Sequence, residues 1–205
     1  QRRFEEAEPL LRLAYEGLRT NLGEEHPTLV VAMRNWGLLL REMNRIDESA
    51  EITRHAVALA RQKLGDEHPL TLDARYYQAT DLFREGRYIE AASILEDVWT
   101  TQCRVAGESH ERTAQTLAAL GYAWFKLGRY ADAEAHLRQS MDIHRQNPTG
   151  SRMNLMWSLR QLAGTLSGQG KFDQARPFAE ELLELRRQDA EKPDADAHAL
   201  NSYAW

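Results

Sequence analysis

The chain has 205 residues, of which 42% are hydrophobic and 28% charged, and its formal net charge is −5. This length suits one domain or two, and the acidic balance argues against a general nucleic-acid binder, which needs a basic face. No apolar run approaches the ~18 residues that a membrane span requires. The single cysteine, Cys103, cannot form an internal disulfide or a zinc cluster. We therefore expect no metal or cofactor, a packing role for Cys103 and a cytoplasmic location.

The chain repeats itself every 42 residues, and the predicted elements follow this spacing. Leu-Gly-Glu-Glu-His-Pro at 22–27 recurs as Leu-Gly-Asp-Glu-His-Pro at 64–69, with weaker copies at 106–111 and 148–152. Apolar residues at helical spacing divide each copy into two helices. The sequence therefore predicts a single all-α array over 1–205. In chain order, we expect a second helix at 3–21, full repeats at 22–63, 64–105, 106–147 and 148–190, and a first helix at 194–205.

A second landmark separates the two helices of each copy. Gly86, Gly128 and Gly170 stand just before the aromatic turn, and Asn44 takes the same place in the first full copy. Glycine and asparagine tolerate the left-handed conformation that ends many helices, so the next helix of the first full copy is expected at about 46–63. Small residues recur where paired helices must approach closely. They are Gly37, Ala79, Gly121 and Ala163 in first helices, and Ala7, Ser49, Ala91, Ala133 and Ala175 in second helices.

A small residue in mid-helix, a Gly-Arg-Tyr turn and an Ala three residues on resemble the tetratricopeptide repeat. The 42-residue period, longer than the usual ~34, and the Leu-Gly-Asp-Glu-His-Pro segment are similar to the kinesin-light-chain-like branch. The resemblance extends from Phe4 to about Gln188 and implies a right-handed superhelical solenoid of helix pairs. Kinesin light chains resemble one another in an Asn-Asn pair on the first helix, which they use to bind cargo. Here the corresponding pairs are Arg34-Asn35, Tyr76-Tyr77, Ala118-Ala119 and Arg160-Gln161, so a motor-adaptor role does not carry over.

In the fold that this resemblance implies, the first helices line a concave groove. The groove positions are basic and aromatic although the whole chain is acidic. Arginine can hold a carboxylate with two hydrogen bonds, and Tyr and Trp offer apolar area with a polar handle. The candidate partner-binding residues are Arg34, Leu38, Arg41, Tyr76, Phe83, Arg84, Tyr122, Phe125, Lys126, Trp157 and Arg160.

The leading hypothesis is a scaffold that binds a protein or peptide carrying acidic residues beside bulky apolar ones. The alternative is a regulatory or sensor segment of a larger bacterial signalling enzyme, such as a serine/threonine kinase or ATPase, with its catalytic domain elsewhere. A repeat that contacts nucleic acid is a third hypothesis. Both ends fall inside a repeat, so we expect a piece of a longer array. Open solenoid ends expose apolar faces, which predicts end-to-end contacts and a homodimer.

Catalysis finds no support in the pattern, and we expect a chain that is not an enzyme and has no catalytic residues. His26, His68 and His110 share one repeat position, but ligands of one metal ion must lie within about 5 Å of each other. We expect these histidines to cap or pack at helix starts. The carboxylate pairs Glu24-Glu25 and Asp66-Glu67 lie near helix N-termini, where the dipole stabilises negative charge without catalysis.

Overall fold

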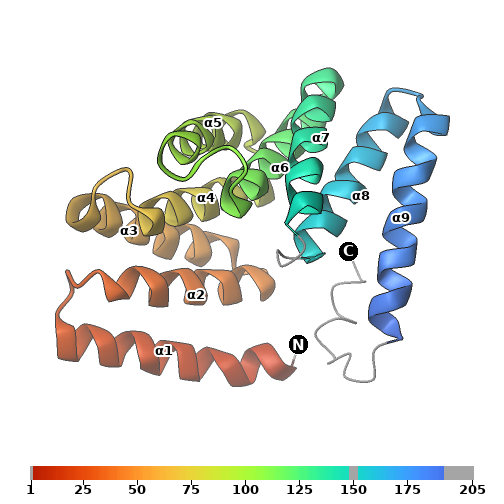
Figure 1. Ribbon diagram of the computed structural model, residues 1–205. Helices are drawn as coiled ribbons and strands as arrows, with labels where there is room; N and C mark the ends of the chain where they lie inside the picture. The colour runs from red at the N-terminus through yellow and green to blue at the C-terminus, as the bar shows by residue number, and fades with distance from the viewer. Residues whose placement is uncertain (1, 148–151, 192–205) are drawn as a thin grey trace.

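The computed structural model describes residues 2–147 and 152–191, and over these the chain is a stack of helices without a strand. The helices follow one another in chain order along a curved path (Figure 1). They are α1 (Arg2–Leu22), α2 (Thr28–Glu42), α3 (Ile46–Leu64), α4 (Pro69–Arg84), α5 (Tyr88–Ala106), α6 (Glu111–Lys126), α7 (Tyr130–Gln146), α8 (Arg152–Gly168) and α9 (Phe172–Ala190). None of them is both long and apolar enough to cross a membrane.

The helices form two layers. Each helix contacts the next one in sequence, and α2, α4, α6 and α8 also contact one another in turn. Among the described helices, α3, α5, α7 and α9 make no such contacts within their own layer. The even-numbered helices therefore form the inner, concave layer of an all-α solenoid, as the sequence predicts. The repeat boundaries stay a prediction, and the helix expected at 194–205 lies outside the described residues.

The turns between paired helices confirm the left-handed residues expected from the sequence. Asn44 has a φ of 61°, and Gly86, Gly128 and Gly170 each have a φ of 74°. In all four turns the following backbone N–H donates to a carbonyl five residues earlier, at 2.8 to 2.9 Å. This is the hydrogen bond of a Schellman motif, which satisfies an orphaned carbonyl at a helix end. The aligned positions therefore share one local structure. The expected helix at 46–63 corresponds to α3.

Close approach explains the small residues inside the helices. A Cβ added to Gly121 would lie 2.7 Å from Leu137 Cγ, and one added to Gly37 would lie 3.1 Å from Ile52 Cγ2. Ala79 and its neighbour in the next helix, Ala91, are fully buried. Leucines such as those at 95, 117, 137, 159 and 162 fill the space between successive pairs, so the core runs the length of the stack.

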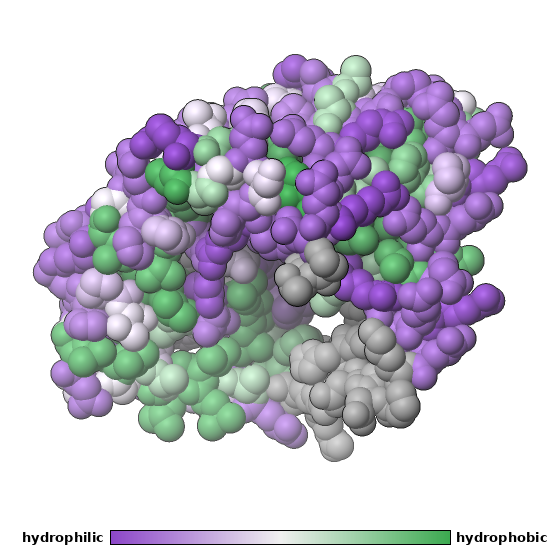
Figure 2. Space-filling view, in the orientation of Figure 1, coloured by the Kyte–Doolittle hydropathy of each residue, from purple (hydrophilic) through white to green (hydrophobic). Residues whose placement is uncertain are grey.

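Apolar side chains also reach the surface. Figure 2 shows them gathered along the lower edge, over α1, and around a hollow near the centre, whereas the upper surface is mainly hydrophilic. On α1, Leu10 and Leu13 are among the most exposed large apolar side chains of the described residues. The homodimer expected from open ends stays a prediction.

One edge of the stack carries ion pairs that join the two ends of a single repeat. Lys63, at the end of α3, pairs with Glu25 in the loop before α2, and Arg104 pairs with Glu67 in the same way at 2.6 Å. These cations hold the pKa of both carboxyls below the usual range. The carboxylates that precede the helices thus have cationic partners at the far end of the same repeat, in addition to the helix dipole.

Candidate functional site

A pocket of about 430 Å³ opens on the inner layer, where α2, α4, α6 and α8 meet. We call it the anchor pocket. Four aromatic rings and three arginines contribute to its wall. Its lining residues are Arg41, Tyr76, Thr80, Phe83, Arg84, Ala119, Tyr122, Trp157, Arg160 and Gln161.

The aromatic rings of the anchor pocket support one another. The Phe83 and Tyr122 rings meet edge to face with centroids 5.1 Å apart, and Tyr122 lies 5.8 Å from Trp157. Such pairs add rigidity and contact area without many rotatable bonds. Burial raises the pKa of Tyr76 to about 12, so this side chain stays a neutral phenol at physiological pH. The rings form a preformed apolar surface at the centre of the groove.

The arginines of the pocket occupy different positions. Arg84 and Arg160 are exposed at the rim, whereas the Arg41 side chain is only 10% exposed. Among the described residues that line the pocket, none carries a carboxylate. The site therefore combines apolar walls with positive charge in an otherwise acidic chain, which favours a ligand with an acidic group beside an apolar one.

Arg41 belongs to a buried cluster that we call the polar joint, formed with Ser49, Thr80 and Asp81. Its guanidinium lies 3.4 Å from Asp81 Oδ1 and also contacts the Thr80 hydroxyl. Ser49 Oγ lies 3.1 Å from the same carboxylate oxygen. Burial raises the pKa of Asp81, and the charge of Arg41 opposes that shift. The cluster connects α2 and α3 to α4, so Arg41 holds two repeats together as well as facing the anchor pocket.

The structure brings together seven of the eleven candidate residues in the anchor pocket. Arg34 lies outside it and pairs with Asp73 at 3.5 Å, and Leu38 is half-buried on α2. The Phe125 ring lies 5.9 Å from the ring of Tyr130 in the same repeat. The Lys126 ammonium does not line the pocket but lies over the Tyr122 ring, 5.5 Å from its centroid.

Three lining residues were absent from the candidate set, but the repeat register contains a signal for each. Thr80 is in register with Leu38 and Tyr122, which are both candidates. Ala119 and Gln161 occupy positions of the Asn-Asn pair of kinesin light chains. The departures from that pair therefore shape the pocket.

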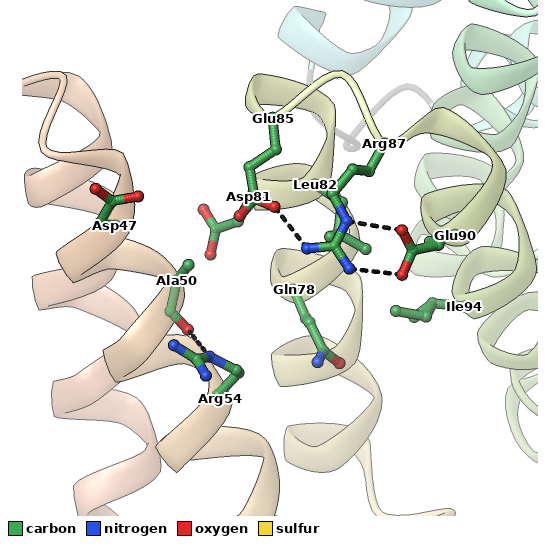
Figure 3. A pocket seen from close by; sticks show the side chains of 10 residues that line it. All are labelled: Asp47, Ala50, Arg54, Gln78, Asp81, Leu82, Glu85, Arg87, Glu90 and Ile94. Atoms are coloured by element: carbon green, nitrogen blue, oxygen red, sulfur yellow. Dashed lines mark hydrogen bonds and ion pairs between the residues drawn. The ribbon is translucent and has the colours of Figure 1, made fainter.

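A larger pocket of about 480 Å³ lies on the other side of α4, between α3 and α5 (Figure 3). Four carboxylates and two arginines line it. Arg87 is tied to Glu90 by two hydrogen bonds of 2.6 and 2.7 Å and to Glu85 by one of 2.7 Å. Arg54 donates to the Ala50 carbonyl of its own helix at 3.2 Å. This outer pocket is net acidic and does not suit an acidic ligand.

A third pocket, of about 210 Å³, adjoins the anchor pocket, with which it shares Tyr76 and Trp157. We call it the side pocket. It contains residues of α4, α6, α7 and α8, and α7 contributes a histidine that the sequence pattern did not indicate as a binding residue. The side pocket is lined by Tyr76, Gln115, Ala118, His144, Met153, Asn154 and Trp157.

The repeated histidines have the capping role expected from the sequence. The Nδ1 atoms of His26, His68 and His110 accept hydrogen bonds from backbone N–H groups two residues later, at 3.3, 3.2 and 3.1 Å. Over the part of the chain that the structure describes, no group of three or more His, Cys, Asp or Glu residues is placed to hold a metal. Cys103 is half-buried, and burial raises the pKa of its thiol, which disfavours the nucleophilic thiolate.

Family models of the tetratricopeptide repeat match residues 31–102, 78–146 and 112–188, and a second model with the same description matches 1–28. Among curated proteins, none matches the chain.

Solved structures share the fold. The chain is similar to BtubC (BKLC) from P. vanneervenii, with 18% identity, a TM-score of 0.76 and coverage of 92% of this chain and 75% of that one. It is similar to a putative kinesin light chain from Podosopora anserina with nearly identical repeats, with 21% identity, a TM-score of 0.69 and coverage of 92% and 90%. RapI in its apo form gives 14% identity, a TM-score of 0.73 and coverage of 94% and 72%. The chain belongs to the tetratricopeptide repeat family, and its structural relatives include kinesin-light-chain-like repeat proteins.

Proposed function

We propose that the chain is a protein-interaction scaffold that binds a peptide segment in its concave groove, with an acidic residue beside a bulky apolar one. The apolar side chain occupies the anchor pocket between Tyr76, Tyr122 and Trp157. The acidic residue meets Arg84 and Arg160 at the rim. The observation that supports this most is a single pocket with four aromatic rings and three arginines.

The physical argument rests on complementarity. Rigid aromatic anchors in a concave pocket supply much of the binding free energy in protein interfaces. Arginine at the rim selects a carboxylate and speeds encounter with an acidic partner. The net acidic outer pocket opposes the same ligand, so the proposal assigns the partner to the concave face. A cytoplasmic location is part of the same proposal. The regulatory segment of a signalling enzyme stays an alternative prediction.

The test uses peptides selected from a displayed random library on the full chain, measured by fluorescence anisotropy. Reversing two rim charges, Arg84→Glu with Arg160→Glu, should weaken binding of acidic, aromatic peptides at least about tenfold, which corresponds to ~1.4 kcal/mol. The matched control is Arg176→Glu with Arg187→Glu on α9, whose side chains are 69% and 71% exposed. The control changes net charge equally and should alter affinity less than about twofold. Equal losses of affinity in both variants would show a general charge effect and contradict peptide binding in the groove.

A further inference from the structure

One residue that lines the side pocket, His144, has a buried polar atom without a hydrogen-bond partner. The His144 side chain is 1% exposed, and its Nδ1 lies 3.4 Å from Glu111 Oε2. Its Nε2 is buried without a hydrogen-bond partner. A buried polar group that lacks a partner costs about 1–3 kcal/mol, so a native structure that retains one invites an explanation.

The neighbours of His144 determine which hydrogen bond Nε2 can make. Burial lowers the pKa of the imidazole, so it is neutral at physiological pH, although the charge of Glu111 opposes this shift. A carboxylate only accepts hydrogen bonds, so the single ring proton of the neutral imidazole lies on Nδ1 and faces Glu111. Nε2 then carries a lone pair and accepts. The Glu111 carboxylate is held in place from α8 by Asn154 Nδ2, at 2.8 Å from its Oε1.

The position of the pocket connects it to the ligand of the anchor pocket. Tyr76 and Trp157 line both cavities, so the side pocket lies next to the proposed peptide site. Met153 borders the side pocket and is strongly exposed. Because methionine is unbranched and flexible, it can move aside to admit a side chain that reaches the buried nitrogen.

We propose that the side pocket binds the primary amide of an Asn or Gln side chain of the peptide, whose N–H donates to His144 Nε2. This inference rests on the proposed peptide binding and adds a second specificity position beside the acidic and apolar ones. An amide carries two donors and one acceptor and no charge.

Charged side chains fit the side pocket less well. A carboxylate has no proton to donate to Nε2 and is repelled by Glu111. An ammonium has three donors to satisfy, whereas Nε2 offers one acceptor and both Glu111 oxygens already have partners at 2.8 and 3.4 Å. Three arginines line the adjoining pocket and disfavour a further cation. Of the amide, carboxylate and ammonium groups, the neutral amide is the one that supplies a donor to Nε2 without a charge.

The test titrates the ¹⁵N-labelled full chain with three small probes of matched shape: propionamide, propionate and propylammonium. The NMR signals to follow are His144 Nε2 and the Trp157 indole N–H. We expect a saturable shift of Nε2 with propionamide at a concentration at least about tenfold lower than with either ion. A response to propionate or propylammonium that is equal or stronger overturns the proposal, and so does the absence of a saturable response to all three.

A filled pocket provides the control. Ala118 also lines the cavity and is almost fully buried, so Ala118→Leu should occupy the space and abolish the propionamide response. Circular dichroism checks that this variant folds, and if it does not, the comparison of the three probes on the unmodified chain decides alone. Propionamide binding without peptide binding would contradict only the proposed function. Peptide binding without the propionamide response would contradict only the side pocket.

Discussion

The polar joint stands on register positions that are apolar one repeat later, where Phe83 lines the anchor pocket. Arg41, Ser49 and Asp81 align with Phe83, Ala91 and Ala123 in the next copy. In the polar joint, the charged groups of Arg41 and Asp81 are buried and pair with each other. In the anchor pocket, the aromatic rings pack against one another in the wall, and Arg84 and Arg160 lie at the rim. A repeat scaffold can therefore use equivalent positions either to attach neighbouring repeats or to build a ligand surface.

The largest effect should come from breaking the polar joint. Asp81→Ala leaves the buried Arg41 cation without its carboxylate, which costs about 3–5 kcal/mol of unfolding free energy. Chemical denaturation followed by circular dichroism measures the loss. The double variant Arg41→Phe with Asp81→Ala copies the apolar arrangement of the next repeat and should recover most of it. A single variant that loses less than about 1 kcal/mol would show that the pair does not hold the joint.

A smaller loss of stability should come from overpacking the close contact between α6 and α7. Gly121→Ala places a Cβ 2.7 Å from Leu137 Cγ, and this overpacking should destabilise the fold by about 1–3 kcal/mol. Gly164→Ala is the matched control, because no atom beyond its own helix lies within 4 Å of its added Cβ. The control should stabilise the fold by up to about 1 kcal/mol through helix propensity. Effects of the same sign in thermal melts would contradict a role for close packing at Gly121.

The smallest effect concerns Glu134, which joins α7 to the turn before α9. Its carboxylate pairs with Lys171 at 2.9 Å and with Arg138 at 2.8 Å, and Lys171 contributes most to lowering its pKa to about 2. A carboxyl whose pKa is lower in the folded than in the unfolded state stabilises the fold above about pH 4.5. This stabilisation is lost as the pH falls toward 2. We expect Glu134 to contribute about 1–2 kcal/mol to the free energy of unfolding at neutral pH, because its partly exposed partners weaken the ion pairs.

Comparing urea denaturation of the chain and of Glu134→Gln at pH 7 and pH 3 isolates this contribution. The stability difference between the two proteins should shrink on acidification. A difference that stays constant or grows would show that the carboxylate does not stabilise the fold through its charge.

The helices and turns could be predicted because their signals are local. Asn44 and its three glycine counterparts mark each turn, and the 42-residue register carries one assignment to the next copy. The seven candidates that line the anchor pocket were accessible for the same reason, since register places them on the inner face.

The remaining details depend on how neighbouring repeats meet. Arg41 was expected in the groove, but its burial against Asp81 follows from the packing of α2 on α4, which a single repeat does not encode. Phe125 shares the register of Arg41 but packs toward Tyr130. His144 belongs to an outer helix, and its side chain reaches the inner layer between α6 and α8. Side-chain direction across an interface decides all three positions.

The chain of nearest-neighbour contacts has a mechanical consequence. Because each described helix touches only those close to it in sequence, no long-range contact ties one end of the stack to the other. Tension applied along the array would peel helix pairs away in sequence, and each released copy of 42 residues adds about 140 Å of contour length. The ion pairs of Lys63 with Glu25 and of Arg104 with Glu67 each join the two ends of one copy, so they resist the unfolding of that copy and not its separation from the next. Such an array would therefore lengthen copy by copy under load and not in a single step.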